Sequence, residues 1–376
     1  MDYYFVYSSG GGGGDWNGID RVFKKHMPIH FKKNLLIKFG DIYFNHKGSK
    51  KLLKQKNWDT IDNARDWLIN NTGDSYLNNT SDLIMDVGTT KIVNYVDFHN
   101  PNFTVDQIIN EFDRLVDSED ILEKYAEVIF KSKIDNAITF DIPNPFKIRN
   151  QGGNAIRNIF NDPGCKSLLT DKCVKYANKT YKLLGNKSDQ LLTILPAFLS
   201  DSEIKIYLKR LVYKPKKIAI GALIEMRKDQ EFTDTLLRLD SALILKNYSK
   251  VHFLGCGGLK KARLIKNTLG NHSNFSVDNT TAYNRSFDGN TRGTAQSCYI
   301  DYLNNNQIRI TPSTKGEILK IHSITNSNIK HFSDKEMKEI INSVLEHQSQ
   351  NSSTTTYDNR AKLAIHNFDV FKDNAD

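Results

Sequence analysis

The sequence is poor in cysteine: it has four in 376 residues, and no two of them form a CxxC or CxC pair. This spacing argues against a structural zinc site and a disulfide framework, so we expect no metal and a reduced protein of the cytoplasm. No apolar run approaches the roughly 20 residues of a membrane span. The first residues carry no basic region ahead of their short apolar run. We therefore expect neither a membrane segment nor a secretory signal.

The charge of the chain is biased towards the basic side. The formal net charge is +9 and the pI is about 9.1, and lysines and arginines recur in clusters such as Lys214 to Lys217 and Lys260-Lys261. A basic surface gains free energy by releasing counterions from a phosphate backbone, so a nucleic acid is a plausible partner. The alternative is an ordinary solvated surface. Hydrophobic residues make up 39% of the chain, which suffices for a folded core.

Eight short apolar runs recur along the chain, and stretches with helical spacing separate several of them. Near-continuous apolar runs are typical of strands that are buried on both faces. Eight such strands alternating with helices predict a (β/α)8 TIM barrel, an α/β fold; a doubly wound open sheet is the alternative. The runs cover residues 3–8, 34–40, 82–88, 136–142, 191–198, 217–223, 251–256 and 274–279.

Several helices and a C-terminal extension are also predicted. Residues 105–130 have apolar side chains at three- and four-residue spacing, which predicts one helix. Ser333 and Glu336 form a capping-box pattern ahead of a helix over 333–348. The segments 292–303 and 306–313 are consistent with a peripheral hairpin. We expect a barrel domain over 1–345 and a flexible tail over 346–376.

Three of the predicted strands end in an aspartate: Asp86, Asp141 and Asp278. A barrel carries its chemistry at the C-terminal ends of its strands, so closure of the barrel would bring these acids to one mouth. Each acid alone is weak evidence, because aspartate often ends a strand as a turn residue. Three together predict a site.

Three carboxylates without a metal signature suit chemistry at an N-glycosidic bond. One can attack C1′ of a sugar and form a glycosyl ester, and a second can shuttle the proton of the departing base. The third can accept hydrogen bonds from the adjacent N1–H and 2-NH₂ groups of guanine. A divalent-metal site of three aspartates is the competing interpretation.

At these residues the chain resembles the tRNA-guanine transglycosylase superfamily. Five segments match in order: DVG at 86–88, NAITFDIPNP at 136–145, IAIGAL at 218–223, VHFLGCG at 251–257 and SVDNTTAYNR at 276–285. The resemblance implies the barrel fold. It implies that Asp86 is the general acid/base, Asp141 binds guanine and Asp278 is the nucleophile. It further implies that the backbone at Gly221 and Ala222 contacts the base and that Leu254 packs against it.

The chain also departs from this family. The zinc-binding CxCxxC…H segment that follows the barrel in the tRNA enzymes has no counterpart here, and Cys298 stands alone. The pattern is more similar to the DNA-directed, DpdA-type branch, some of whose members are viral. That branch is implied to exchange guanine in DNA for a 7-deazaguanine base such as preQ0.

The resemblance therefore predicts DNA, flipped or single-stranded, and a free 7-deazapurine base as partners, with no other cofactor and no zinc. Arg285 and Arg292 would hold phosphates; a surface ion pair is the alternative for each. The same chemistry on tRNA, and a barrel N-glycosidase or DNA glycosylase, are the alternative activities. The sequence leaves Asp82 open beside Asp86 as the proton shuttle.

Overall fold

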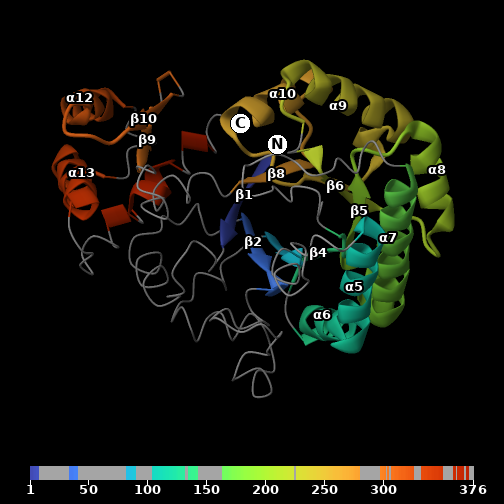
Figure 1. Cartoon of the computed structure of the whole chain (residues 1–376). Helices are drawn as coiled ribbons and strands as arrows, with labels where there is room; N and C mark the ends of the chain where they lie inside the picture. The colour runs from blue at the N-terminus through green and yellow to red at the C-terminus, as the bar shows by residue number, and fades with distance from the viewer. Residues whose placement is uncertain are drawn as a thin grey trace.

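Eight parallel strands close into a barrel (Figure 1). Each strand pairs with the next along the chain, and β1 pairs with β8 through Tyr4 and Asp278 among others. This closure confirms the (β/α)8 barrel and excludes the open sheet. The strands are β1 (Asp2–Tyr7), β2 (Asn34–Lys38), β3 (Asp82–Asp86), β4 (Asn136–Ile138), β5 (Leu191–Pro196), β6 (Lys217–Gly221), β7 (Lys250–Phe253) and β8 (Phe275–Asn279).

The structure is a computed structural model, and it describes fourteen segments of the chain. They are 1–7, 34–40, 82–89, 104–131, 134–142, 163–223, 226–279, 297–301, 303–304, 306–325, 332–349, 359–360, 362–367 and 370–371.

The inside of the barrel has three layers, because alternate residues of each strand point inwards. The middle layer is apolar, with Tyr4, Leu36, Ile84, Ile138 and Ile194 packed into one buried cluster. Below it, the first residues of several strands form a polar floor. Above it, the last residues of the strands line the mouth, where Asp86 and Asp278 lie. The sequence alternation thus separates an acidic mouth from a polar floor.

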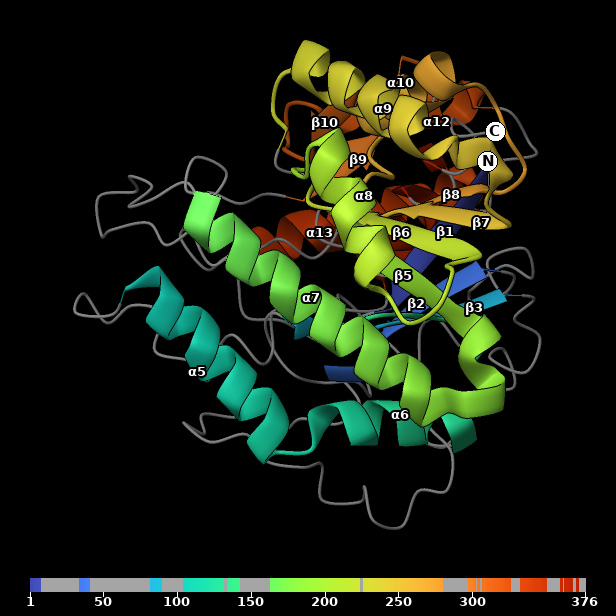
Figure 2. The same cartoon turned by 90° about the vertical axis from the view of Figure 1, so that its right-hand side faces the viewer.

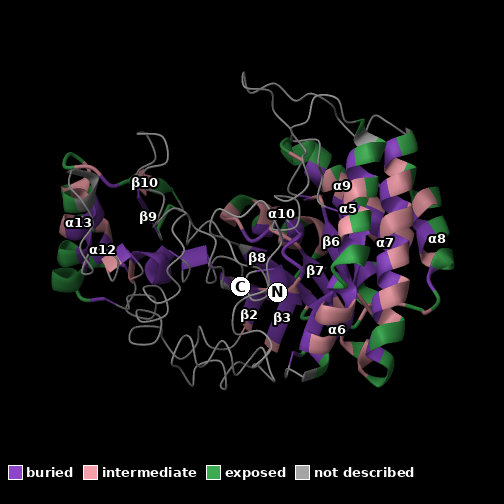
Figure 3. Ribbon diagram, turned by 60° about the horizontal axis from the view of Figure 1, so that its bottom comes forward, coloured by how far each residue is buried: buried purple, intermediate pink, exposed green. Residues whose placement is uncertain are grey.

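The described helices next to the barrel cover one side of it (Figure 2). Their buried faces pack on the strands and their exposed faces point outwards (Figure 3). No helix in the described segments has the length and hydropathy that a membrane crossing needs. The helices next to the barrel are α5 (Val105–Ser118), α6 (Ile121–Lys131), α7 (Pro163–Leu184), α8 (Asp201–Arg210), α9 (Asp229–Leu243) and α10 (Leu259–Leu269).

The single helix expected over 105–130 is two helices. Asp120 has a φ of 51°, in the left-handed region, and separates α5 from α6. Aspartate tolerates this conformation better than most residues, so Ser118-Glu119-Asp120 forms a turn inside the apolar pattern. The long helix α7 was not singled out by the sequence patterns. Its buried face includes Cys165, Cys173 and Ala177, which give a weaker apolar signal than leucine or isoleucine.

Beyond the barrel lie a two-stranded sheet and two helices: β9 (Cys298–Ile300), β10 (Gln307–Arg309), α12 (Lys315–Ile324) and α13 (Asp334–Ser349). The strands are antiparallel, which confirms the hairpin. Ser333 Oγ accepts from the Glu336 amide at 3.3 Å, and Glu336 Oε2 accepts from the Ser333 amide at 2.8 Å. The predicted capping box is therefore present.

The prediction of a flexible tail from residue 346 is wrong for the segment 362–367. This segment is helical, and Leu363, Ala364 and Ile365 are buried. The Asn367 side chain accepts from the amide of Ile300 at 2.9 Å and donates to a carbonyl of the same strand. These contacts add the segment to the edge of β9, so it belongs to the folded C-terminal part.

Candidate active site

Three aspartates converge at the C-terminal mouth of the barrel, as the sequence predicts. Asp86 is the last residue of β3, Asp278 lies near the end of β8, and Asp141 follows β4 by three residues. Asp86 interacts electrostatically with both of the other carboxylates. Asp86 ends β3 and Asp141 follows the neighbouring strand β4, and closure of the barrel brings Asp278, on β8, to the same mouth.

The environment favours the protonated form of two of these acids. Burial raises the pKa of Asp86 above its ordinary value, and the charge of Asp278 adds to this effect, while the ammonium group of Lys38 opposes it. Burial and the charge of Asp86 raise the pKa of Asp141 to about 7. A hydroxyl group at Thr89 donates a long hydrogen bond of 3.4 Å to Asp141 Oδ1. The mouth can thus hold both neutral and ionised carboxyl groups near neutral pH.

Asp278 is held by hydrogen bonds from β7 and from the turn that follows it. The amide of Gly255 donates to Asp278 Oδ1 at 2.7 Å, and His252 Nε2 lies 3.1 Å from the same oxygen. Gly255 has a φ of 68°, in the left-handed region, where a residue with a Cβ would be strained. The turn therefore needs a glycine in order to direct its amide at the carboxylate.

The three residues expected to contact a base also lie at the mouth. Gly221 ends β6, and a Cβ added to it would lie 3.9 Å from Asp141 Oδ2 and 3.1 Å from Ile194 Cδ1. Ala222 follows in the left-handed region with a φ of 65°. Leu254 is partly buried against the apolar layer inside the barrel. Because it has no side chain, Gly221 brings backbone next to the Asp141 carboxylate, and the side chain of Ile194 occupies the adjoining space.

Asp82, left open as a proton shuttle, lies at the opposite end of the barrel. Its carboxylate accepts hydrogen bonds from Tyr4, Asn136 and Lys250, and Lys217 in turn donates to Asn136. Burial favours the protonated form of Asp82, but the ammonium group of Lys250 and these hydrogen bonds hold its pKa below the ordinary value. Asp82 is thus an ionised member of the polar floor, and Asp86 is the acid at the mouth.

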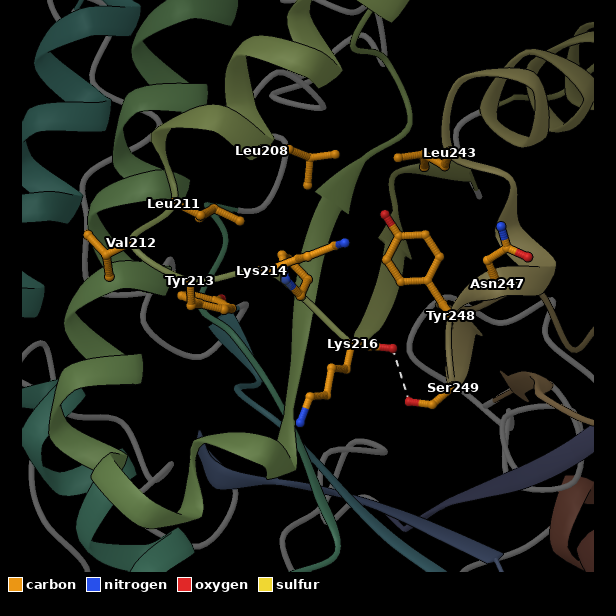
Figure 4. A pocket seen from close by; sticks show the side chains of 11 residues that line it. Leu208, Leu211, Val212, Tyr213, Lys214, Lys216, Leu243, Asn247, Tyr248 and Ser249 are labelled. Atoms are coloured by element: carbon orange, nitrogen blue, oxygen red, sulfur yellow. Dashed lines mark hydrogen bonds between the residues drawn. The ribbon is translucent and has the colours of Figure 1, made fainter.

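The pocket drawn in Figure 4 does not coincide with the three acids. It has a volume of about 930 Å³ and is lined by residues of the segments that precede β6 and β7, including Tyr213, Lys214 and Tyr248. These segments enter their strands at the N-terminal end of the barrel. In parallel barrels the chemistry lies at the other end, so we place the candidate active site at the acidic mouth.

Some contributors to the site were not predicted from the sequence. His252 and Ser276 lie within short, mostly apolar strands, where a single polar residue resembles a satisfied core residue. The alternation of Ser276 and Asp278 on one face of β8 was the available signal. Arg285 and Arg292 lie outside the described residues. In the described part of the chain, no group of three or more His, Cys, Asp or Glu side chains is arranged to hold a metal ion.

Comparisons with known proteins leave the activity open. No protein-family model matches the chain, and no curated protein matches it. The resemblance to the transglycosylase superfamily therefore rests on the short segments and on the order in which they occur along the barrel.

Proposed function

We propose that the protein exchanges guanine in DNA for a 7-deazaguanine base through a covalent aspartyl-glycosyl intermediate. The observation that carries this proposal is the convergence of Asp86, Asp141 and Asp278 at one barrel mouth, each in a different environment. A base-exchange reaction needs three different carboxyl functions, a nucleophile, a proton shuttle and a base-reading group. The three environments correspond to these functions.

Asp278 is the proposed nucleophile. Its hydrogen bonds from Gly255 and His252 suit an ionised carboxylate. One carboxylate oxygen attacks C1′ of the nucleotide, the C1′–N9 bond breaks, and guanine departs with a proton supplied by Asp86. The raised pKa of Asp86 suits a group that starts protonated.

The second half of the reaction reverses these steps with a different base. The deazaguanine enters and gives its N9 proton to the carboxylate of Asp86. N9 then attacks C1′, and the ester bond to Asp278 breaks. One glycosidic bond replaces another, so the exchange needs no ATP and no redox cofactor. The free base is the co-substrate.

Asp141 is the proposed base-reading group. An ionised carboxylate accepts hydrogen bonds from N1–H and 2-NH₂ together, a pair that guanine and 7-deazaguanine share and adenine lacks. Gly221 places backbone, not a side chain, beside this carboxylate, so its peptide groups can contact a bound purine. Leu254 and the backbone of Ala222 complete the proposed base pocket.

DNA is the proposed polymer substrate. The net charge of +9 favours a polyanion, and the nucleotide must leave the base stack before Asp278 can reach its C1′. The absence from the sequence of the zinc-binding segment of the tRNA enzymes favours DNA over tRNA. Arg285 and Arg292 remain the proposed phosphate contacts.

The test is base exchange with mass detection. Guanine-containing DNA and unmodified tRNA are incubated separately with the protein and excess preQ0, then digested to nucleosides. We expect deoxy-preQ0 from DNA, lost in Asp278→Asn and retained in the matched control Asp189→Asn, whose carboxylate is exposed and paired with Lys216. Product only from tRNA would identify the RNA enzyme. Release of guanine without replacement would identify a glycosylase.

A further inference from the structure

Both described hydrogen bonds to the Asp278 carboxylate reach the same oxygen. The Gly255 amide and His252 Nε2 lie 2.7 Å and 3.1 Å from Oδ1. Among the described residues, no hydrogen bond to Oδ2 accompanies them. Oδ1 of Asp278 is thus held by β7 and by the turn after it, while Oδ2 has no hydrogen-bond partner among the described residues.

His252 is fully buried inside the barrel and has partners on both ring nitrogens. Its Nδ1 lies 2.9 Å from Ser276 Oγ, and its Nε2 faces Asp278. The ring also packs edge-on against Tyr4, with ring centroids 5.5 Å apart. Burial is the largest cause that raises the pKa of the Tyr4 hydroxyl above its ordinary value, so Tyr4 brings no negative charge to the imidazole near neutral pH.

Serine, histidine and aspartate in a row are also the residue types of a hydrolase triad, in which serine is the nucleophile. The burial argues against that arrangement here. Ser276 is 1% exposed and lies one inward position below Asp278 on β8, whereas Asp278 is 7% exposed and nearer the mouth. A substrate that enters from the mouth meets Asp278 before Ser276. The aspartate, and not the serine, is therefore placed to act as the nucleophile.

The hydroxyl of Ser276 controls which nitrogen of His252 carries the proton. A serine hydroxyl has one proton to donate. If it donates to His252 Nδ1 across 2.9 Å, the ring proton lies on Nε2 and points at Asp278 Oδ1. If it donates to the Val251 carbonyl, which is 3.3 Å away, Nδ1 must carry the proton instead. The neutral ring then presents a lone pair to the carboxylate, and two acceptors face each other. The 2.9 Å contact is a hydrogen bond in either form, so its length does not separate them. The carboxylate of Asp278 favours the Nε2–H form, in which Ser276 donates to Nδ1.

We infer that His252 is a positioning residue for the nucleophile: Ser276 fixes its Nε2–H tautomer, and Nε2–H fixes Asp278 Oδ1 so that Oδ2 faces C1′. The catalytic part of this inference rests on the proposed exchange reaction. The tautomer and its dependence on Ser276 do not.

Two variants of His252 separate positioning from packing. His252→Gln keeps a side-chain N–H that can reach Oδ1, and His252→Phe keeps a ring against Tyr4 but removes the donor. In the exchange assay with DNA and preQ0, His252→Phe should lower kcat about 100-fold, the order of effect expected when a reacting group loses its orientation, with KM for preQ0 nearly unchanged. His252→Gln should recover most of this loss. Thermal unfolding of both variants checks the fold.

A second measurement needs neither substrate nor activity. Nitrogen NMR of the histidine-labelled full chain identifies the protonated nitrogen of His252, assigned through its loss in His252→Gln. We expect a single proton on Nε2 in the natural chain and a population with the proton on Nδ1 in Ser276→Ala. Ser249→Ala, which alters a serine at the far end of the barrel, is the matched control and should leave the signal unchanged.

The outcomes distinguish this inference from the proposed function. A proton on Nδ1 or on both nitrogens in the natural chain would overturn it, as would a folded His252→Phe variant with unchanged kcat. The natural protein could exchange no base and still carry the His252 proton on Nε2, with a shift towards Nδ1 in Ser276→Ala. The proposed function would then be wrong, while the hydrogen bonds from Ser276 through His252 to Asp278 would be confirmed.

Discussion

Replacement of Asp141 by asparagine should make the protein more stable, and the gain should depend on pH. Burial and the charge of Asp86 raise the pKa of Asp141 from 3.8 to about 7 in the folded protein. The folded state therefore binds this proton more tightly than the unfolded state does. Stability is highest where Asp141 is protonated in both states and falls as the pH rises from about 4 to about 7. Asparagine is neutral throughout and removes this loss.

The size of the expected gain in stability follows from the shift in the pKa of Asp141. A change from 3.8 to about 7 is roughly three pKa units, and each unit corresponds to about 1.4 kcal/mol. The cost of ionising Asp141 in the folded protein is thus about 4 kcal/mol as an upper limit. Near pH 4 the variant should gain almost nothing from the lost charge, and from pH 7 upwards it should gain up to this full amount.

Urea unfolding at a series of pH values between 4 and 8 measures this effect. The difference in the free energy of unfolding between Asp141→Asn and the natural chain should grow from about pH 4 to about pH 7 and then level off. Asp189→Asn is the control, because the exposed Asp189 pairs with Lys216 and its pKa is lowered by that contact. A difference that stays constant between pH 4 and 8 would refute the reasoning, since the carboxyl group would then ionise at no cost.

Three further predictions follow from the mouth and the floor of the barrel. Binding of free preQ0, measured by calorimetry, should strengthen about tenfold per pH unit up to about pH 7, because only ionised Asp141 accepts both base donors; an affinity independent of pH would contradict this role. Ala222→Gly should stabilise the fold by about 0.5–1 kcal/mol in urea unfolding, because Ala222 occupies the left-handed region; a loss of stability would contradict this. Lys250→Met should destabilise the fold by about 3 kcal/mol, because it leaves the negative charge of Asp82 without its partner. Base exchange by the folded fraction should be unchanged. A selective loss of exchange would contradict this, because it would show that the polar floor takes part in the reaction.

The barrel was predictable from the sequence because strands buried on both faces leave near-continuous apolar runs. Each of the eight runs overlaps a barrel strand. The helical layer was less accessible. The turn at Asp120 is set by one left-handed residue. The buried face of α7 includes Cys165, Cys173 and Ala177, which weaken its periodic signal. Tertiary contacts also explain why the segment 362–367 is ordered, because Asn367 binds the edge of β9.

The three acidic residues of the candidate site were predictable from the sequence. The residues that hold these acids by hydrogen bonds were not. Asp86, Asp141 and Asp278 were found because each follows an apolar run, and parallel strands bring their ends to one mouth. The contact between His252 and Asp278 joins two strands, so no local pattern encodes it. The separation of Asp82 from Asp86, in contrast, is local, because the two residues begin and end the same strand.

The proposed mechanism requires a covalent bond between Asp278 and the sugar, and this bond can be trapped. A guanine-containing DNA oligonucleotide is incubated with the protein, denatured without delay and examined by intact mass and peptide mapping. The account predicts a DNA adduct on Asp278 that disappears when excess preQ0 is added before denaturation and is absent from Asp278→Asn. Base exchange that proceeds without any adduct, or an adduct on another residue, would contradict it.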